Sequence, residues 1–193
     1  GGNHVNDPYQ VSMRIERDGA SCGACHGRAD NTIVHAQGGF VDHQQQFAEL
    51  FSSKKRVMDC VDCHNPHATV KYAEDFGALT SCETCHFEKA VEQKVTTRQH
   101  DCVACHMPNI VVNGQGDLPA YRADMQTHLF AINPRGENQF NEDGTLVPSW
   151  LTVEYACGAC HGPDNRGPDL PLERLREIAT GYHDPALAGS GND

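Results

Sequence analysis

The ten cysteines of this 193-residue chain all lie in five copies of one motif, Cys-x-x-Cys-His. The copies begin at Cys22, Cys60, Cys82, Cys102 and Cys157, and their other cysteines and histidines are Cys25, Cys63, Cys85, Cys105, Cys160, His26, His64, His86, His106 and His161. This motif is the attachment signature of a c-type haem: both thiols bond to the porphyrin, and the histidine binds its iron. The sequence therefore predicts five covalently bound haems c.

Three other uses of paired cysteines fit the pattern less well. A disulfide framework of an exported protein explains neither the constant gap of two residues nor the histidine that follows every pair. Four-cysteine zinc sites take cysteine pairs two at a time, so five pairs would leave one pair over. A thioredoxin-like redox motif would occur once, within a βαβ unit. Haem attachment uses every cysteine and every adjacent histidine.

The composition predicts an unusual core. Hydrophobic residues make up 38% of the chain, cysteines included, and aromatic residues make up 7%. Such a chain has little side-chain material for an ordinary core. We therefore expect a single pentahaem domain over residues 1–193 that is mostly irregular, with few α-helices, minimal β-structure and the stacked haems as its core. Without haem the chain is expected not to fold, as in small metal-dependent domains.

Charge and hydropathy exclude several classes of partner. The formal net charge is −11 with neutral histidines, and haem propionates would add negative charge. This balance argues against nucleic-acid binding and against a polybasic membrane contact. No run of 18 apolar residues predicts a transmembrane segment. Haem attachment of this kind takes place outside the cytoplasm, so we expect an exported chain after signal removal, extracellular or at the cell surface, or alternatively in the periplasm.

Regular structure is predicted at three helices and one turn. The helices cover about Val41–Phe51, Glu83–Thr97 and Pro171–Thr180, the last with apolar residues at helical spacing. Residues 107–156 are expected to be irregular with short strands, and the turn at Asn141–Gly144 predicts a hairpin. Calcium in this acidic turn is a weak alternative, because the turn matches the EF-hand loop poorly.

Seven histidines lie outside the motifs, and each of the five irons has a second axial position to fill. We expect most of these histidines to be distal haem ligands: His4, His35, His43, His67, His100, His128 and His183. Methionine is the alternative distal ligand, at Met13, Met58 or Met125. Two imidazoles per iron is the favoured pattern, and it closes the iron to substrates.

Spacing distinguishes several of these histidines. His67 follows His64 too closely to reach the other face of the same haem, so it would bind the iron of a neighbouring haem. The same argument applies to His100, which lies two residues before the fourth motif. The first predicted helix would aim His43. His4 lies near the N-terminus, and we expect it either to reach a haem of another subunit or to have no ligand role.

The chain resembles the multihaem c-type cytochromes of anaerobic respiration. The resemblance rests on the haem motifs and on the segments 43–47, 60–67, 100–108 and 124–130. The outer-surface cytochromes of metal-reducing microbes, including those that polymerise into filaments, are similar, as are soluble pentahaem electron donors to nitrite reductase. The resemblance implies closely stacked haems with mostly bis-histidine ligation. The chain departs from this pattern in having no histidine between Phe51 and Cys60, which leaves the partner of one haem unassigned.

The favoured function is electron transfer along the haems rather than catalysis. An iron closed by two histidines has no position for a substrate. The expected partners are other redox proteins or extracellular electron acceptors, together with further copies of the chain in a head-to-tail homopolymer. A discrete carrier is one alternative. A multihaem reductase for nitrite, hydroxylamine or a sulfur oxyanion is another, and it would need one open iron.

Overall fold

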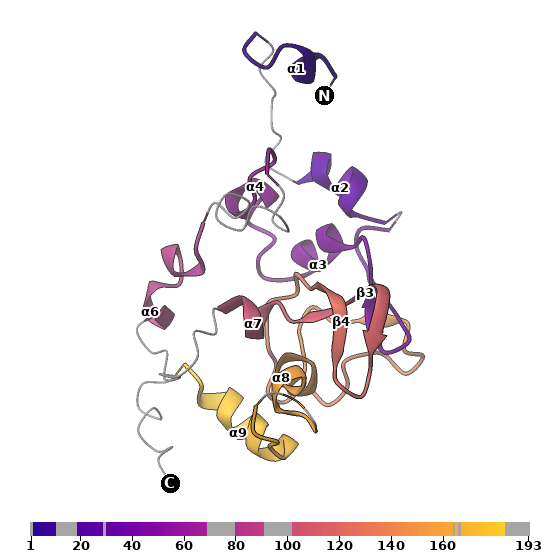
Figure 1. Cartoon of the computed structure of the whole chain (residues 1–193), viewed down its shortest axis with the longest axis vertical. Coiled ribbons are helices and arrows are strands. Elements are labelled where there is room, and N and C mark those ends of the chain that lie inside the picture. Colours follow the sequence, from indigo (N-terminus) through magenta and orange to yellow (C-terminus); the bar gives the residue numbers. More distant parts are fainter. Residues whose placement is uncertain are drawn as a thin grey trace.

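The computed structural model describes residues 2–10, 19–28, 30–68, 80–90, 102–163, 165 and 167–183. These residues form short helices and one mixed sheet (Figure 1). The helices are α1 (Gly2–Asn6), α2 (Ala20–His26), α3 (Gln46–Ser52), α4 (Cys60–Cys63), the 3₁₀-helix η1 (Cys82–Thr84), α6 (Phe87–Ala90), α7 (Cys102–His106), α8 (Val153–His161) and α9 (Leu172–Gly181). The strands are β1 (Val34–Gln37), β2 (Phe40–Asp42), β3 (Asn109–Asp117), β4 (Arg122–Gln126) and β5 (Leu146–Val147).

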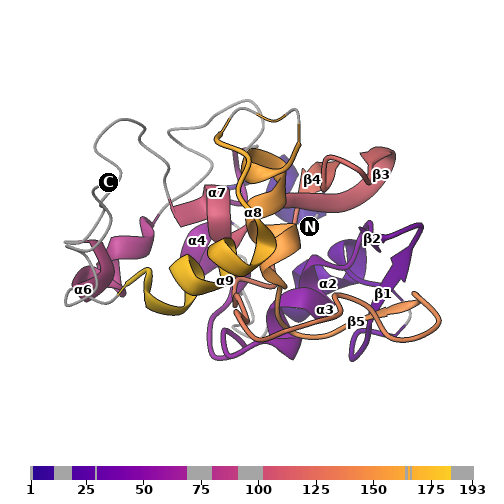
Figure 2. The same cartoon turned by 90° about the horizontal axis from the view of Figure 1, so that it is seen from below.

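The sheet and the helix α6 lie on opposite sides of the molecule. Figures 1 and 2 both show α6 at one edge, the strands at the other, and α7 and α8 between them. Helix α1 stands apart at one end of the long axis, beyond α2 and α4 (Figure 1). Helices α2 and α4 lie nearer to α1 than α7 and α8 do (Figure 1).

The sheet is built on a tight hairpin and has the strand order β4-β3-β2-β1-β5. Strands β1 and β2 pair antiparallel, and the two residues between them, Gly38 and Gly39, have φ angles of 61° and 81°. Such a two-residue turn needs positive φ, which glycine adopts without steric cost. Strand β2 pairs parallel with β3, β3 pairs antiparallel with β4, and β5 pairs antiparallel with β1.

A small protein core packs around the sheet and α8. Its buried cluster consists of Val34, Ala36, Val41, Ala48, Ile110, Val111, Leu129, Val147, Leu151, Tyr155 and Ala156. The expectation of minimal β-structure is corrected here, because the described residues contain a five-stranded sheet with this apolar cluster. The short strands expected within residues 107–156 are present as β3, β4 and β5. Strands β1 and β2 were not predicted, because they are too short to show a clear alternation of apolar and polar residues. Stacked haems as a further part of the core stay a prediction.

The helix expected over Val41–Phe51 is wrong at its first half. Val41 belongs to β2, where it pairs with Val111 of β3, and α3 begins only at Gln46. Between them Gln44 has a φ angle of 58°, a left-handed conformation that a helix cannot contain. His43 consequently lies in the connection before α3 and is not placed by a helix.

The C-terminal helix predicted from the sequence is confirmed, whereas the second predicted helix and the hairpin are confirmed only in part. The C-terminal helix is α9, with Pro171 as its N-cap. Within Glu83–Thr97 the described residues form η1 and α6, interrupted at Cys85 and His86; residues 91–97 lie outside the described part of the chain. The turn at Asn141–Gly144 is confirmed by the bond from Gly144 N to Asn141 O, but the strand that follows it pairs with β1 instead of closing a hairpin.

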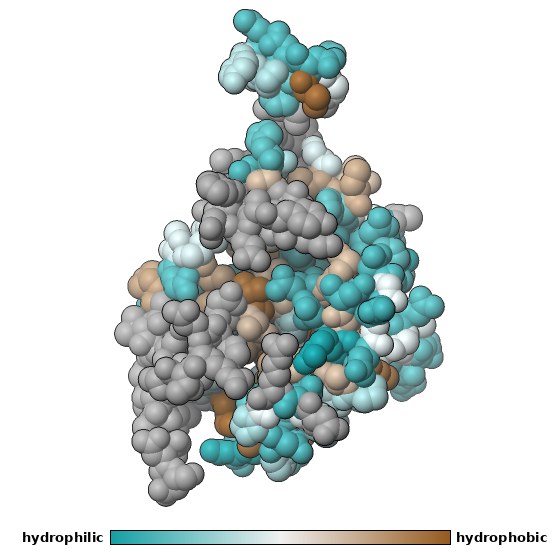
Figure 3. Space-filling model, in the orientation of Figure 1, coloured by the Kyte–Doolittle hydropathy of each residue, from teal (hydrophilic) through white to brown (hydrophobic). Residues whose placement is uncertain are grey.

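The surface agrees with the acidic composition. The face shown in Figure 3 is mostly hydrophilic, with hydrophobic residues scattered over it. No helix in the described part of the chain has the length and apolar character needed to cross a membrane.

Replacing Ile110 with alanine should test the sheet core. Ile110 is fully buried, and Ile→Ala changes at such sites cost about 2–5 kcal/mol of unfolding free energy. Ile33 is 38% exposed, so Ile33→Ala is the matched control and should cost much less. Denaturant unfolding followed by far-ultraviolet circular dichroism measures both variants, and equal losses would contradict the observed core.

Candidate functional site

Each of the five cysteine motifs forms a helical turn. They lie in α2, in α4, across η1 and the residue after it, in α7 and in α8. Cysteines three residues apart in a helix share one face, so both thiols of a motif can bond to the same group. The second motif begins with a capping box, in which Asp59 and Asp62 satisfy the backbone N–H groups at the start of α4. None of the ten cysteines forms a disulfide.

Thiols of successive motifs are neighbours. The pKa of Cys60 is raised to about 11, mainly by burial and then by the nearby Cys22 thiol, through its charge and a hydrogen bond. The same causes act on Cys102, where burial comes first and Cys82 second in raising the pKa. The first motif therefore lies against the second, and the third against the fourth.

Two further pairs of thiols from consecutive motifs influence one another through their charges. Burial raises the pKa of Cys63, with a smaller contribution in the same direction from Cys85 of the third motif. Burial likewise raises the pKa of Cys157 to about 12, and the next cause is Cys105 of the fourth motif. Each motif thus affects the pKa of a thiol in a neighbouring motif of the sequence.

Two motif histidines face a histidine from a distant part of the chain. The ring centroids of His64 and His128 are 6.1 Å apart, and those of His106 and His183 are 6.0 Å apart. Two imidazoles bound to one metal by bonds of about 2 Å have centroids about 6 Å apart, because each ring centre lies about 1 Å beyond its ligating nitrogen. Both pairs have the spacing of the two axial ligands of one iron.

His128 is held in place by a buried carboxyl group. Oε2 of Glu49 in α3 accepts hydrogen bonds from Thr127 Oγ1 at 2.5 Å and from the backbone N of His128 at 2.6 Å. Burial raises the pKa of Glu49 to about 7 and lowers that of His128 to about 4, so the imidazole is neutral at pH 7. A neutral imidazole is the form that binds a metal.

Backbone carbonyl groups orient two of the motif histidines, His106 and His161. His106 Nδ1 donates to the carbonyl oxygen of Phe130 at 2.6 Å, and His161 Nδ1 donates to that of Pro168 at 3.1 Å. Phe130 has a φ angle of 59°, an uncommon conformation for a residue other than glycine. With the proton on Nδ1, each ring keeps its Nε2 lone pair available, which is the usual arrangement of metal-bound histidine.

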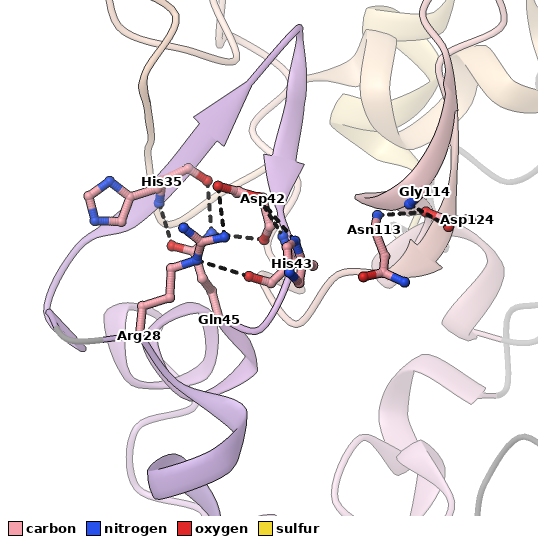
Figure 4. A network of polar contacts seen from close by, with 8 residues as sticks. All are labelled: Arg28, His35, Asp42, His43, Gln45, Asn113, Gly114 and Asp124. Carbon is pink, nitrogen blue, oxygen red and sulfur yellow. Dashed lines mark hydrogen bonds and ion pairs between the residues drawn. The ribbon is translucent and has the colours of Figure 1, made fainter.

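A polar network beside the first motif holds His35 and His43 (Figure 4). Gln45 is fully buried, accepts a hydrogen bond from the backbone N of His35 and donates to the carbonyl groups of His35 and Asp42. Asp42 lies 3.2 Å from His43 Nδ1 and 2.9 Å from the guanidinium of Arg28. The carboxylate thus orients the His43 ring in the way that second-shell carboxylates orient metal ligands.

An open cavity of about 810 Å³ adjoins this network. Its lining includes Arg28, Asp30, His35 and Asp42. The first two of these residues follow the first motif closely in the sequence. On the neighbouring strands the carboxylate of Asp124 accepts bonds from two backbone N–H groups of β3 (Figure 4). These bonds join β3 to β4, the strand that leads to His128.

The remaining candidates are less closely organised. The rings of His4 and His67 are 6.3 Å apart, but neither belongs to a motif, so the pair does not join a motif histidine to a distal one. His86 is exposed, and its Nε2 lies 2.7 Å from Nζ of Lys55. Met125 packs against the apolar cluster, which argues against a ligand role. His100 and Met13 lie outside the described residues.

The residues present fit a haem better than a bare metal ion. In the described part of the chain no group of three or more His, Cys, Asp or Glu side chains is placed to hold a metal ion. A haem needs only two protein ligands, because the porphyrin supplies the others. Some large aromatic side chains that adjoin candidate ligand histidines in the sequence are exposed to solvent, including Phe87 after His86 and Tyr182 before His183. A macrocycle would cover such side chains.

Comparisons of the chain with protein-family models, curated proteins and solved structures find no match.

Sequence reasoning identified the candidate ligands but missed the residues that support them. Glu49, Asp42 and Gln45 had no pattern to mark them, because single polar residues next to short strands and helices are common. Their role is visible only when the fold brings Glu49 to the segment at 127–128, which is distant in sequence. The contact of Lys55 with His86 likewise joins residues 31 positions apart.

Replacing Glu49 tests the anchoring of His128. Glu49→Leu leaves the Thr127 hydroxyl and the His128 N–H buried without an acceptor, which costs about 1–3 kcal/mol of unfolding free energy for each group. Glu49→Gln keeps a carbonyl acceptor and should cost much less. Guanidinium unfolding of both variants measures the difference. Equal stability of the leucine and glutamine variants would show that the two hydrogen bonds do not hold this loop.

Proposed function

We propose that this chain carries five haems c, one on each cysteine motif, and transfers electrons along them. The observation that carries the proposal is the pairing of the motif histidines His64 and His106 with His128 and His183 at axial-ligand spacing. Each partner comes from a segment far from its motif in sequence, so local chain geometry does not account for the pairing. The haem supplies the iron that takes up and releases an electron.

The contribution of the chain is the order and spacing of the five attachment sites. Cys60 shares a side-chain hydrogen bond with Cys22, and Cys102 shares one with Cys82, while Cys63 and Cys157 are influenced by the charges of Cys85 and Cys105. Because thiols bond to the porphyrin edge, these contacts favour haems that meet edge to edge in sequence order. A continuous series of this kind suits conduction through the protein.

The ligand pairs favour a carrier over a reductase. A catalytic haem needs an open axial position and nearby proton donors. His64 and His106 each face a second imidazole instead, and the ring of His128 is neutral and buried. We therefore propose electron transport without substrate turnover, with other redox proteins or extracellular electron acceptors as partners.

The proposal extends to location and assembly. Covalent haem attachment implies an exported chain, at the cell surface or in the periplasm. The motif helices run along the molecule from α2 to α8 (Figure 1), so the first and last haems would lie near different ends. Copies that meet head to tail would then continue the series as a filament. Electron micrographs of the native protein distinguish fibres from discrete carriers.

Haem content is the first test of this function. The intact mass and the pyridine haemochrome assay should both give five haems c per chain, and reductive titration should take up five electrons. The double variant Cys82→Ala with Cys85→Ala should lose one haem and one electron, because it removes one motif. A wild-type chain with markedly fewer than five haems would refute the proposal.

Removing His128 tests the ligand pairing. In His128→Ala the iron bound to His64 loses its second imidazole, so about one fifth of the ferric haem should change from low spin to high spin in electron paramagnetic resonance. Gln37→Ala, an exposed change in β1, is the control and should leave the spectrum as in the wild type. An unchanged spectrum in His128→Ala, with five haems still attached, would show that His128 is not an axial ligand.

A further inference from the structure

The third motif has an amine where the second and fourth have an imidazole. Nζ of Lys55 lies 2.7 Å from Nε2 of His86, the nitrogen that a c-type haem iron would bind. By contrast, His64 and His106 face His128 and His183. The segment 52–59 contains no histidine, and its possible iron ligands are Lys54, Lys55 and Met58. Of these, Lys55 is the residue whose side chain reaches His86.

The position of Lys55 is set by its surroundings. Its backbone N donates to Oγ of Ser53 at 3.0 Å, and that hydroxyl donates to the carbonyl oxygen of Leu50 at the end of α3. Nζ lies 5.9 Å from the centre of the Phe130 ring, within the range of a cation–π contact. Burial raises the pKa of the Cys63 thiol, and the charge of Lys55 acts against this. The amine thus lies between the second and third motifs.

We propose that Lys55 is the distal ligand of the third haem iron, opposite His86. The inference rests on the proposed function, since it requires a haem on Cys82 and Cys85. A neutral amine has a lone pair for the iron, so Lys55 gives up one proton to solvent as the nitrogen–iron bond forms and any water on that position leaves. The oxidation state of the iron does not change in this step.

The distance between the two nitrogens fits this role after a small movement. An iron between two nitrogen ligands separates them by about 4 Å, given bonds of about 2 Å on each side. The observed 2.7 Å is shorter, so the amine has to withdraw by roughly 1 Å. The flexible four-carbon stem of lysine allows this displacement without moving the backbone. The bonds described above fix the backbone of Lys55, while the contacts of Nζ with His86 and with the Phe130 ring place the amine.

Three variants of the full haem-loaded protein test the inference. Lys55→Ala removes the ligand, and Lys55→His offers an imidazole in its place. Lys54→Ala is the matched control, because Lys54 is the exposed neighbour of the same charge. Each variant is made in a host that attaches haem c, and the haem count is taken first. Electron paramagnetic resonance and near-infrared magnetic circular dichroism of the ferric protein then identify the axial ligands.

The wild type and Lys54→Ala should both show a histidine–amine signature from about one fifth of the haem. Lys55→Ala should lose that signature and gain a high-spin signal of equal weight. Lys55→His should restore a low-spin, bis-imidazole signal. This rescue separates a ligand role from a purely structural one, because an uncharged ring would not replace a surface ion pair or a cation–π contact.

The outcomes also separate this inference from the proposed function. Five haems in every variant, with the Lys55→Ala spectrum equal to that of the wild type, would overturn the ligand role of Lys55 and leave haem binding intact. This result would mean that Lys55 has another role, such as pairing with a haem propionate, or that a histidine fills the position. A wild type with markedly fewer than five haems would instead refute the proposed function itself.

Discussion

The pairing of His64 with His128 is the contact on which the account depends, and the fold gives it an unusual amount of support. His128 is buried and neutral, and its backbone is held by Glu49, a carboxyl group buried with it. A buried carboxyl group is costly unless its hydrogen bonds are made. This carboxyl group lies where the rings of His64 and His128 are 6.1 Å apart. We interpret Glu49 as a residue retained for ligand placement.

Under the proposed function, the sheet would act as the scaffold for the distal ligands, while the helices would carry the attachment sites. Strand β4 leads directly into Thr127 and His128, and Phe130 just beyond them orients His106. The β1–β2 hairpin leads into the network around His35 and His43. Short helices outside the sheet carry the thiols. This division between sheet and helices explains how a chain with a small apolar core can place several histidine side chains close to helices that are distant in the sequence.

The haem motifs were predictable because covalent attachment needs a fixed local spacing, which sequence displays directly. Helix α9 and the turn at Asn141–Gly144 were predictable for the same reason, since each depends on neighbouring residues. The sheet was not, because its strands are short and β2 pairs with β3 across a long separation. The supports at Glu49 and Gln45 were hidden because tertiary contacts alone give them a role. The absence of a histidine between Phe51 and Cys60 is visible in the sequence, whereas the contact of Lys55 with His86 is a tertiary one.

An experimental density map of the haem-loaded protein tests the central claim most directly. The account predicts that the iron of the haem bonded to Cys60 and Cys63 is coordinated by His64 and His128, and that the five irons follow one another in sequence order. A map in which another residue fills the second position on that iron, or in which consecutive motifs hold haems that are not neighbours, would contradict it.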